Sequence, residues 1–369
     1  MSMSEQETSS PVNAAERFDA DLPGSVEREL VRFLHEAAGQ IRMAEPGFVS
    51  GVDALTDFVL GGGKRLRPTF AWWAWRGTGG DPAEAEGVLR AVASLELVQA
   101  CALIHDDLID SSDSRRGRPT VHRAFARQHD ENGWLGTPEM FGLAAAVLIG
   151  DLALAWADDM FNTAALPPER LAAARPAWRA MRTEVLAGQF LDVRTQATGD
   201  SSPEAALRVS RLKTAAYTVQ RPLHLGAALA GADSGQTGAL REFGDDIGVA
   251  FQLRDDLLGV FGDPSVTGKP AGDDLREGKR TLLVALGLAQ AGPHQAEIIA
   301  NAIGNPGLSE AEVDKVRTTL TEVGAVAAVE RRIDELTTTA LAALRAAHLA
   351  EPAATRLAEL AVRATQRTS

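Results

Sequence analysis

The stretch Leu-Ile-His-Asp-Asp-Leu-Ile-Asp occupies residues 103–110 and ends a long apolar pattern with helical spacing. Asp106 and Asp110 are four residues apart, so on a helix both side chains lie on one face, with Asp107 on a neighbouring face. Carboxylates at a helix C-terminus face the negative end of the helix dipole and repel one another. We therefore expect a strongly positive partner at this end of the helix.

A second acidic pair, Asp255 and Asp256, ends another apolar helical pattern about 150 residues later, and Asp263 follows. Mg²⁺ typically binds one or two protein carboxylates and completes its shell with water and phosphate oxygens. A single acidic helix end would be read as solvated surface, but the repetition favours Mg²⁺ ions carrying a phosphorylated ligand. If both clusters serve one site, their helices run parallel across a central cavity and end on the same side.

Basic residues follow the same pattern. Arg115 and Arg116 come directly after the first cluster, where they can bind phosphate oxygens as forks. Lys64 and Arg67 belong to Gly-Gly-Gly-Lys-Arg-Leu-Arg-Pro at 61–68, which is not a Walker A loop because Arg65 replaces the expected Ser or Thr. A glycine turn with solvated cations is the simpler alternative for this segment. Further candidates for phosphate binding are Lys213, Thr214, Lys269 and Lys279.

Composition favours an all-α protein. The chain has 369 residues, 45% of them hydrophobic, and only one Tyr. Its formal net charge of -13 argues against a nucleic-acid partner. The single cysteine, Cys101, excludes an intrachain disulfide and fits a cytoplasmic location.

We expect residues 1–25 to be a disordered tail without a signal peptide, and residues 26–369 to form a single domain. Helices are predicted for 28–44, 49–60, 81–109, 139–163, 168–196, 203–231 and 237–261, with three or four more in 281–366. Loops are predicted at 115–119, 128–138 and 262–278. The apolar run at 141–150 is interrupted by Asp151 and is shorter than the roughly 20 residues of a membrane span, so a buried core helix is expected instead.

His105 and Asp106 also form the His-Asp pair seen in metal-dependent phosphohydrolases. That interpretation needs further histidine ligands, and the other histidines show no suitable spacing. We therefore disfavour it.

Taken together, the motifs resemble those of trans-isoprenyl diphosphate synthases, the polyprenyl synthetase family. The matching segments are Gly-Lys-Arg-Leu-Arg-Pro (63–68), the first cluster (103–110), Arg-Arg-Gly (115–117), Lys-Thr (213–214), Phe-Gln-Leu-Arg-Asp-Asp (251–256) and Gly-Lys-Pro (268–270). The resemblance implies an isoprenoid synthase-type helical bundle around a central apolar cavity. It also implies a homodimer, isopentenyl and allylic diphosphates as substrates, and three Mg²⁺ ions with bound diphosphate.

By position, the resemblance assigns metal binding to Asp106, Asp107, Asp110, Asp255 and Asp256. The main catalytic residues would be Asp106, Asp110, Lys213 and Asp255. The allylic diphosphate would be bound by Arg115, Lys213, Thr214, Gln252 and Lys269. Isopentenyl diphosphate would be bound by Lys64, Arg67, Gln99 and Arg116, and Lys279 would close over the site. The chain departs from the family pattern at Gly259, which replaces a third aspartate, and at Gln99, where many members carry His.

Product length depends on the residues one turn before Asp106. Here they are Cys101 and Ala102, both small, whereas bulky aromatic residues in the family stop growth at fifteen carbons. We therefore expect a twenty-carbon product (geranylgeranyl diphosphate) or a longer one, with a floor at Val98, at Leu95 or on another helix. Close packing of Cys101 and Ala102 against a neighbouring helix is the alternative.

Three alternative functions remain open: a farnesyl diphosphate synthase, a class I terpene cyclase, and a non-catalytic subunit of a heteromeric synthase. A cyclase would not need to bind a second diphosphate, so Lys64, Arg67 and Arg116 count against it. The loss of an aspartate at Gly259 leaves some support for the non-catalytic subunit.

Overall fold

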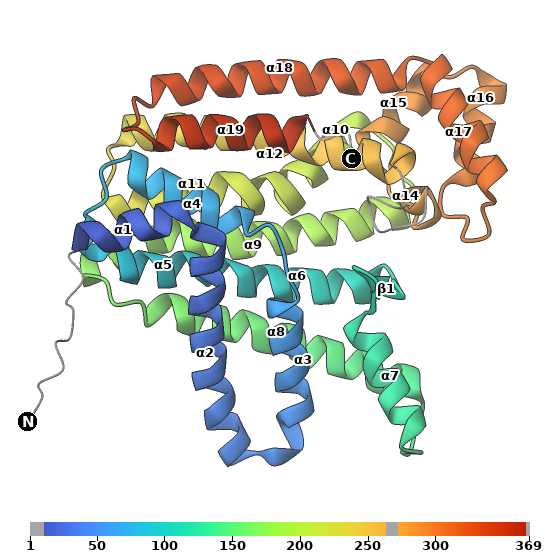
Figure 1. The fold of residues 1–369 in the computed structure, drawn as a ribbon. Helices are drawn as coiled ribbons and strands as arrows, with labels where there is room; N and C mark the ends of the chain where they lie inside the picture. Colours follow the sequence, from blue (N-terminus) through green and yellow to red (C-terminus); the bar gives the residue numbers. More distant parts are fainter. Residues whose placement is uncertain (1–10, 263–271, 367–369) are drawn as a thin grey trace, which may run out of the picture.

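The computed structural model describes residues 11–262 and 272–366, and most of these residues are helical (Figure 1). The two short strands, β1 (Ser114–Arg115) and β2 (Arg118–Pro119), pair antiparallel. The helices are α1 (Pro11–Ala20), α2 (Leu22–Ala44), η1 (Pro46–Phe48), α3 (Val49–Leu60), α4 (Leu66–Gly77), η2 (Pro82–Glu84), α5 (Ala85–Ala93), α6 (Leu95–Ile109), α7 (Val121–Glu131), α8 (Pro138–Asn162), α9 (Pro168–Thr198), α10 (Pro203–Val209), η3 (Ser210–Gln220), α11 (Arg221–Ala230), α12 (Ser234–Phe261), α14 (Asp273–Arg276), α15 (Leu282–Gln290), α16 (Pro293–Ala302), α17 (Glu310–Glu322), α18 (Ala325–Ala346) and α19 (Ala353–Thr365). The all-α prediction is confirmed.

The long helices lie side by side, with α6 between α8 and α9, and with α12, α18 and α19 on the far side of α9 (Figure 1). Helices α2 and α3 project from this bundle as a hairpin, and α14 to α17 gather at the end where α6 and α12 finish. Large aromatic side chains fill the core. Phe161 of α8 stacks on Trp178 of α9 with ring centroids 4.5 Å apart, and both are buried. Buried aromatic pairs of this kind fix the spacing between helices.

The expected disordered tail at 1–25 is wrong for its second half. Helix α1 covers Pro11–Ala20, and Phe18 is buried against Trp72. Asp19 accepts hydrogen bonds from the Trp72 indole N–H (2.8 Å) and from the Arg76 guanidinium (2.9 Å). The polar composition of this segment concealed an amphipathic helix. The treatment of the remaining chain as one domain stays a prediction.

Three local predictions were also incomplete. The helix predicted over 81–109 is divided at Ser94, which separates α5 from α6 and whose hydroxyl donates to Ala91 O (2.6 Å). Helix α7 ends at Glu131 and so includes residues 128–131, which were predicted to belong to a loop. The helix predicted over 203–231 contains the π-helix η3 between two α-helices.

Helix α8 is not the fully buried core helix that the sequence suggested. Within the described part of the chain, two helical segments are long and apolar enough to cross a membrane by length and composition, Pro82–Ile109 and Pro138–Asn162. The most apolar part of the first is 78% buried inside the molecule, but that of α8 is only 39% buried. The face of α8 that points away from the core carries exposed large apolar residues, including Met140 and Leu148.

Candidate active site

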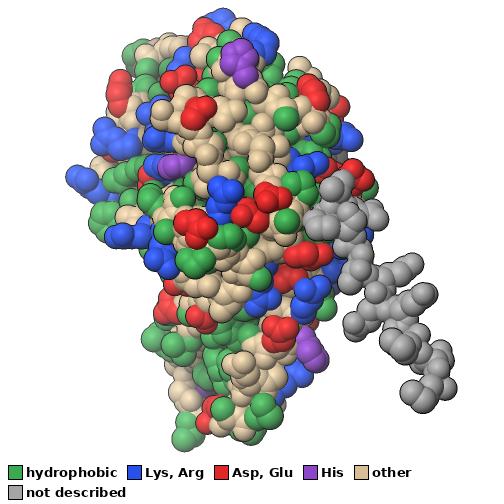
Figure 2. All heavy atoms as spheres, turned by 90° about the vertical axis from the view of Figure 1, so that its left-hand side faces the viewer, with side chains coloured by type: hydrophobic (Ala, Val, Ile, Leu, Met, Phe, Trp, Pro, Cys, Tyr) green, Lys and Arg blue, Asp and Glu red, His purple; other side chains and the backbone are tan. Residues whose placement is uncertain are grey.

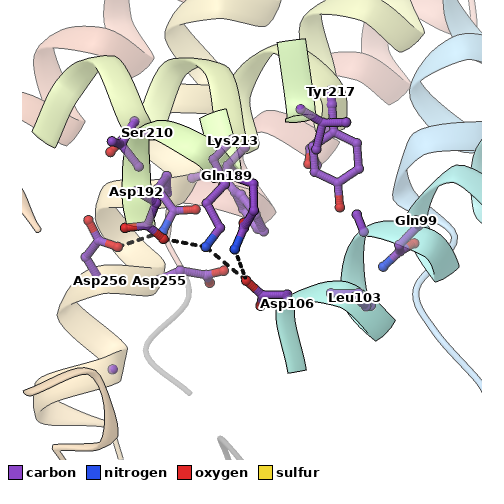
Figure 3. A pocket seen from close by; sticks show the side chains of 18 of the residues that line it. Gln99, Leu103, Asp106, Gln189, Asp192, Ser210, Lys213, Tyr217, Asp255 and Asp256 are labelled. Carbon is purple, nitrogen blue, oxygen red and sulfur yellow. Dashed lines mark hydrogen bonds and ion pairs between the residues drawn. The ribbon is translucent and has the colours of Figure 1, made fainter. Parts of the chain in front are cut away.

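Residues of both aspartate clusters, Asp106 of the first and Asp255 and Asp256 of the second, line one cavity of about 880 Å³. Asp106 reaches it from α6, and Asp255 and Asp256 reach it from α12 (Figure 3). Residues from α9 and η3 close the side between them. The expected meeting of the two clusters is therefore observed.

Lys213 lies at the centre of the site. Its ammonium contacts Asp106 Oδ1 (3.0 Å) and Asp192 Oδ2 (2.6 Å), and the Gln189 amide donates to the same Asp106 oxygen (3.1 Å) (Figure 3). Burial opposes ionisation of Asp106, but Lys213 together with Lys279 and Arg115 holds the pKa of Asp106 below its ordinary value. Burial likewise opposes the charge of Lys213, and Asp106 and Asp192 raise its pKa above the ordinary value. Both groups therefore stay charged at neutral pH.

Two glycines allow this close arrangement. A Cβ at position 188 of α9 would lie 2.2 Å from Lys213 N, and one at position 248 of α12 would lie 2.5 Å from Ala215 Cα. Both distances are shorter than van der Waals contact. The π-helix η3 can therefore lie directly against α9 and α12, which brings Lys213 between the two clusters.

Asp107 does not line the cavity. Its side chain is buried, and both carboxylate oxygens accept from Arg115 Nε at 2.8 Å. Arg115 Nη2 in turn lies 3.7 Å from Asp106 Oδ2. The fixed, planar geometry of such a pair orients the guanidinium. Asp107 therefore positions Arg115, and its predicted part in metal binding gains no support from this placement.

Asp110 is not among the residues that line the cavity, but Asp110 and Lys279, which does line it, join the end of α6 to the segment after α12. Lys279 Nζ lies 3.6 Å from Asp110 Oδ2 and 3.2 Å from Asp274 Oδ1. Burial and the neighbouring Asp106 raise the pKa of Asp110 to about 6. Burial opposes the charge of Lys279, but Asp274 and the acids around it raise its pKa well above the ordinary value. One lysine thus already balances charge from both sides of the cavity.

In the second cluster, Asp255 and Asp256 both line the cavity. The Gln252 amide, one turn earlier on α12, donates to Asp256 Oδ1 (2.6 Å). Burial is the main reason that the pKa of Asp256 rises to about 8, and Asp274 raises it further.

The residues predicted to bind the second diphosphate border the same cavity. Lys64, Gln99 and Arg116 all line it, and Lys64 and Arg116 are exposed. Arg116 and Gly117 have φ values of 52° and 73°, as a two-residue hairpin of type I′ requires, so the β1–β2 hairpin presents Arg116 at its tip. The Arg116 guanidinium donates to the carbonyl of Gly62, which ties the hairpin to the glycine segment.

Arg67 and Arg65 differ from this group because both are buried. Arg67 Nη2 donates to Thr218 Oγ1 (2.9 Å), and its guanidinium carbon lies 4.0 Å from the Tyr217 ring centre. Arg65 donates to Glu96 (2.7 Å). Arg67 therefore lines the cavity from a fixed position, whereas Arg65 anchors the loop to α6.

The three residues predicted to set product length fall into two groups. Ala102 lines the cavity, whereas Cys101 and Val98 are buried and do not line it. Cys101 Sγ lies 3.8 Å from His105 Nδ1, and His105 Nε2 lies 3.2 Å from the carbonyl of Val147 on α8. Burial and Asp151 raise the pKa of the Cys101 thiol to about 12. Cys101 and His105 thus face α8, so for Cys101 the structure agrees with the alternative of close packing against a neighbouring helix. Of the three predicted chain-length residues, Ala102 alone lines the cavity.

Among the residues that border the cavity, sequence reasoning missed several, including Gln189, Asp192, Tyr217 and Asp274. Gln189 and Asp192 are three residues apart, so they share a face of α9, and two polar side chains flanking Phe190 and Leu191 were a usable signal. Of the other predicted residues, Thr214 lines the cavity. Lys269 and Asp263 lie outside the described residues.

The donor chemistry fits magnesium in its usual protein setting. Among residues 11–262 and 272–366, no three His, Cys, Asp or Glu side chains converge tightly enough to hold an ion by themselves. Mg²⁺ rarely uses an all-protein cage and instead bridges one or two carboxylates to substrate phosphates. Asp106 and Asp255 offer carboxylates on opposite sides of one space that could hold a diphosphate.

The chain matches the family model described as polyprenyl synthetase over residues 52–320. A solved geranylgeranyl pyrophosphate synthase of Corynebacterium glutamicum, complexed with isoprenyl diphosphate and magnesium, is 47% identical, with a TM-score of 0.90 over 94% of this chain and 98% of that one. The geranylfarnesyl diphosphate synthase of Aeropyrum pernix is 36% identical over 78% of this chain and 84% of its own length. The geranylgeranyl diphosphate synthase of Mycobacterium tuberculosis is 33% identical over 76% of this chain and 75% of its own. The chain belongs to the polyprenyl synthetase family of prenyltransferases.

Proposed function

We propose that the protein joins isopentenyl diphosphate head-to-tail to an allylic diphosphate, releases pyrophosphate, and makes geranylgeranyl diphosphate or a longer trans-polyprenyl diphosphate. The observation that carries this proposal is that Asp106, the Asp255–Asp256 pair and the Lys64–Arg67 segment line one cavity. Such a cavity offers separate places for two diphosphates. The names and ligand of the relatives support the same reaction.

The allylic diphosphate is assigned to the space between Asp106 and Asp255. Bound Mg²⁺ would be held by Asp106, Asp110, Asp255 and Asp256, and it would stabilise the negative charge that grows on the leaving pyrophosphate. Lys213 and Arg115 are already held in fixed positions beside Asp106, so little reorganisation is needed when that charge develops. Thr214 and Gln252 complete this side.

Isopentenyl diphosphate is assigned to the other side of the cavity, where Lys64, Gln99, Arg67 and Arg116 meet. Lys64 and Arg116 are exposed at the cavity and can turn toward a phosphate. Arg67 is fixed by Thr218 and Tyr217 and acts as a preset contact. This arrangement orients the double bond of isopentenyl diphosphate toward the allylic carbon.

The condensation itself needs no dedicated protein base. Ionisation of the allylic diphosphate leaves a carbocation, the isopentenyl double bond attacks it, and the departing pyrophosphate accepts the proton that is lost. Water would capture the carbocation, so the apolar wall must exclude it. Leu103, Val185 and Ala102 supply such a wall beneath the charged groups.

Three observations weigh against the alternative functions. A class I terpene cyclase would leave the Lys64 and Arg116 side without a ligand. A non-catalytic subunit would leave the carboxylates of Asp255 and Asp256 without a role, although both line the cavity. A farnesyl diphosphate synthase is disfavoured by Ala102, which provides no bulk where growth would have to stop.

We further propose a homodimer in the cytoplasm. Large apolar side chains are exposed in stripes on α8 (Met140, Leu143, Val147, Leu148) and on α9 (Leu186, Phe190, Val193). The opposite face of α8 belongs to the core, and Asp151 interrupts its apolar run, which disfavours a membrane span. Exposed apolar surface of this extent is typical of protein interfaces. Over the face seen in Figure 2, by contrast, charged side chains of both signs are interspersed.

The test is incubation of the purified chain with radiolabelled isopentenyl diphosphate, farnesyl diphosphate and MgCl₂, followed by chromatography of the extracted products. We expect Mg²⁺-dependent formation of a product of twenty or more carbons and none in excess EDTA. Incubation with geranylgeranyl diphosphate alone should release no hydrocarbon. Hydrocarbon release would indicate a cyclase, and absence of any product from both incubations would favour a non-catalytic subunit.

A further inference from the structure

We propose that Asp274 supplies the third carboxylate of the second aspartate cluster, in the space that a side chain at position 259 would fill. This inference rests on the proposed function, because it assigns Asp274 to the magnesium–diphosphate site. Asp274 comes from α14, which lies beyond α12 in the chain. In sequence it is 15 residues after the position where the family pattern places that carboxylate.

The geometry at Gly259 carries the proposal. Residue 259 is one turn after Asp255, so its side-chain direction faces the same cavity, and Gly259 itself lines it. A Cβ built at Gly259 would lie 1.9 Å from Asp274 Oδ2 and 2.5 Å from Asp274 Cγ. A side chain at position 259 would therefore overlap the carboxylate of Asp274 in its present position. The Asp274 carboxylate thus occupies volume next to α12 that glycine at position 259 leaves open.

The position of Asp274 is fixed by the packing of α14. Leu275 is fully buried in the second hydrophobic core, beside α12 and α17. The Arg276 guanidinium donates to Leu308 O from both Nε (3.1 Å) and Nη2 (3.0 Å), and Gly304 N donates to Leu275 O (2.8 Å). A short helix anchored on both sides holds its side chains in defined directions. Asp274 is thus directed into the cavity by residues that do not themselves bind ligand.

Asp274 is also connected to the first cluster. Lys279 Nζ lies 3.2 Å from Asp274 Oδ1 and 3.6 Å from Asp110 Oδ2, so one cation spans the carboxylates of both sides. A hard divalent cation needs the same oxygen donors that this ammonium now contacts. Asp274 therefore binds magnesium or holds it in position, and glycine at position 259 leaves room for the Asp274 carboxylate.

Calorimetric titration of MgCl₂ into the full-length protein with saturating inorganic pyrophosphate tests this assignment. Asp274→Asn keeps the shape and an oxygen for Lys279 but removes the charge, and we expect Mg²⁺ affinity to fall about tenfold. Asp334→Asn, the same change at an exposed position of α18, is the matched control and should bind as wild type. Circular dichroism should give equal helical content for all variants.

A carboxylate swap separates a metal role from a structural one. Asp274→Ala should weaken Mg²⁺ binding, and Gly259→Asp combined with Asp274→Ala should recover affinity to within about threefold of wild type, because the carboxylate returns to the same volume. Unchanged affinity in Asp274→Asn, or a double variant no better than Asp274→Ala, would overturn the proposal. If wild type transfers prenyl groups while Asp274→Asn titrates normally, only this proposal fails. If wild type shows neither Mg²⁺-dependent pyrophosphate binding nor transfer, the proposed function fails as well.

Discussion

At the scale of single residues, the buried carboxylates of the site are only partly neutralised by the lysine and arginine side chains around them. Asp106 is held ionised by cations around it, whereas Asp110 and Asp256 have raised pKa values because burial and neighbouring acids oppose their charge. A metal ion would relieve that repulsion. The individual carboxylates should therefore differ in what their removal costs.

Asp106 should be indispensable for turnover. Asp106→Asn keeps the shape and the contact with Gln189 but removes the charge that Lys213 balances. We expect turnover to fall at least about 100-fold, as for loss of a single group that stabilises transition-state charge. Steady-state assays of prenyl transfer measure this, and circular dichroism should show unchanged helical content. Turnover close to wild type would exclude Asp106 as an essential metal ligand.

Asp256 should make the free protein less stable at alkaline pH. Its pKa is about 8 in the folded protein, above the ordinary value of 3.8, so the folded state binds more protons than the unfolded one between these limits. The free energy of unfolding should therefore decrease as pH rises from about 4 to 8. Asp256→Asn avoids this loss and should raise Tm relative to wild type at pH of about 8.5 in EDTA, with a smaller difference near pH 5. A Tm difference that grows toward low pH would contradict this.

The sequence could predict the residue types at the site, because clusters of like charges and the spacing of motifs can be recognised in the sequence itself. It could not predict that Asp107 binds Arg115 and leaves the cavity, because Asp106 and Asp107 are adjacent and only the packing of α6 decides which one faces inward. It also could not predict Asp274, whose role depends on a contact with Gly259.

At the scale of elements, α6 carries two functions on two faces. The face with Ala102 and Asp106 lines the cavity, and the face with Cys101 and His105 packs against α8. Helical periodicity predicted the helix, but the neighbouring helices determine which face each residue joins. This division makes two adjacent residues respond differently to the same substitution.

Ala102→Phe should shorten the product by about one isoprene unit. The added ring would enter the cavity one turn, about 5.4 Å, below Asp106. Cys101→Phe should instead reduce the free energy of unfolding by about 1–3 kcal/mol, because Cys101 is 4% exposed and its surroundings have no room for a ring. Product chromatography and denaturant titration measure the two effects. An unchanged product from Ala102→Phe would show that the growing chain does not pass this residue.

The π-helix η3 is the element that sequence periodicity was least able to predict. The wider turns of π-helices are frequent at functional sites, and here Lys213, Thr214 and Tyr217 of η3 line the cavity. The pattern of apolar residues in this segment is compatible with an ordinary α-helix, so the sequence predicted one continuous helix. The segment is also in close contact with α9 at Gly188 and with α12 at Gly248, which the sequence of η3 alone does not reveal.

At the scale of the whole molecule, the all-α bundle and the meeting of the two clusters were predictable, because the helices are long and their ends carry matching motifs. The exposed face of α8 could not be predicted. A strongly apolar helix has the same sequence pattern whether it packs inside its own core or against another chain. The early helix α1 was missed because few apolar residues suffice to bury one face of a short helix.

The apolar stripes on α8 and α9 should hold two chains together. Phe190 is 69% exposed, and Phe190→Asp should convert a dimer into a monomer, as seen by sedimentation velocity. Met43→Asp, at an 83% exposed position of α2, is the control and should leave the assembly unchanged. A wild-type monomer, or a Phe190→Asp variant that remains dimeric, would contradict the proposed interface.

The most direct measurement is anomalous scattering from crystals grown with MnCl₂ and inorganic pyrophosphate, with Mn²⁺ taking the place of Mg²⁺. We expect manganese peaks beside Asp106 and beside Asp255, with one pyrophosphate bridging them inside the cavity. Manganese at only one cluster, or pyrophosphate bound outside the cavity, would contradict the claim that the two clusters form a single site.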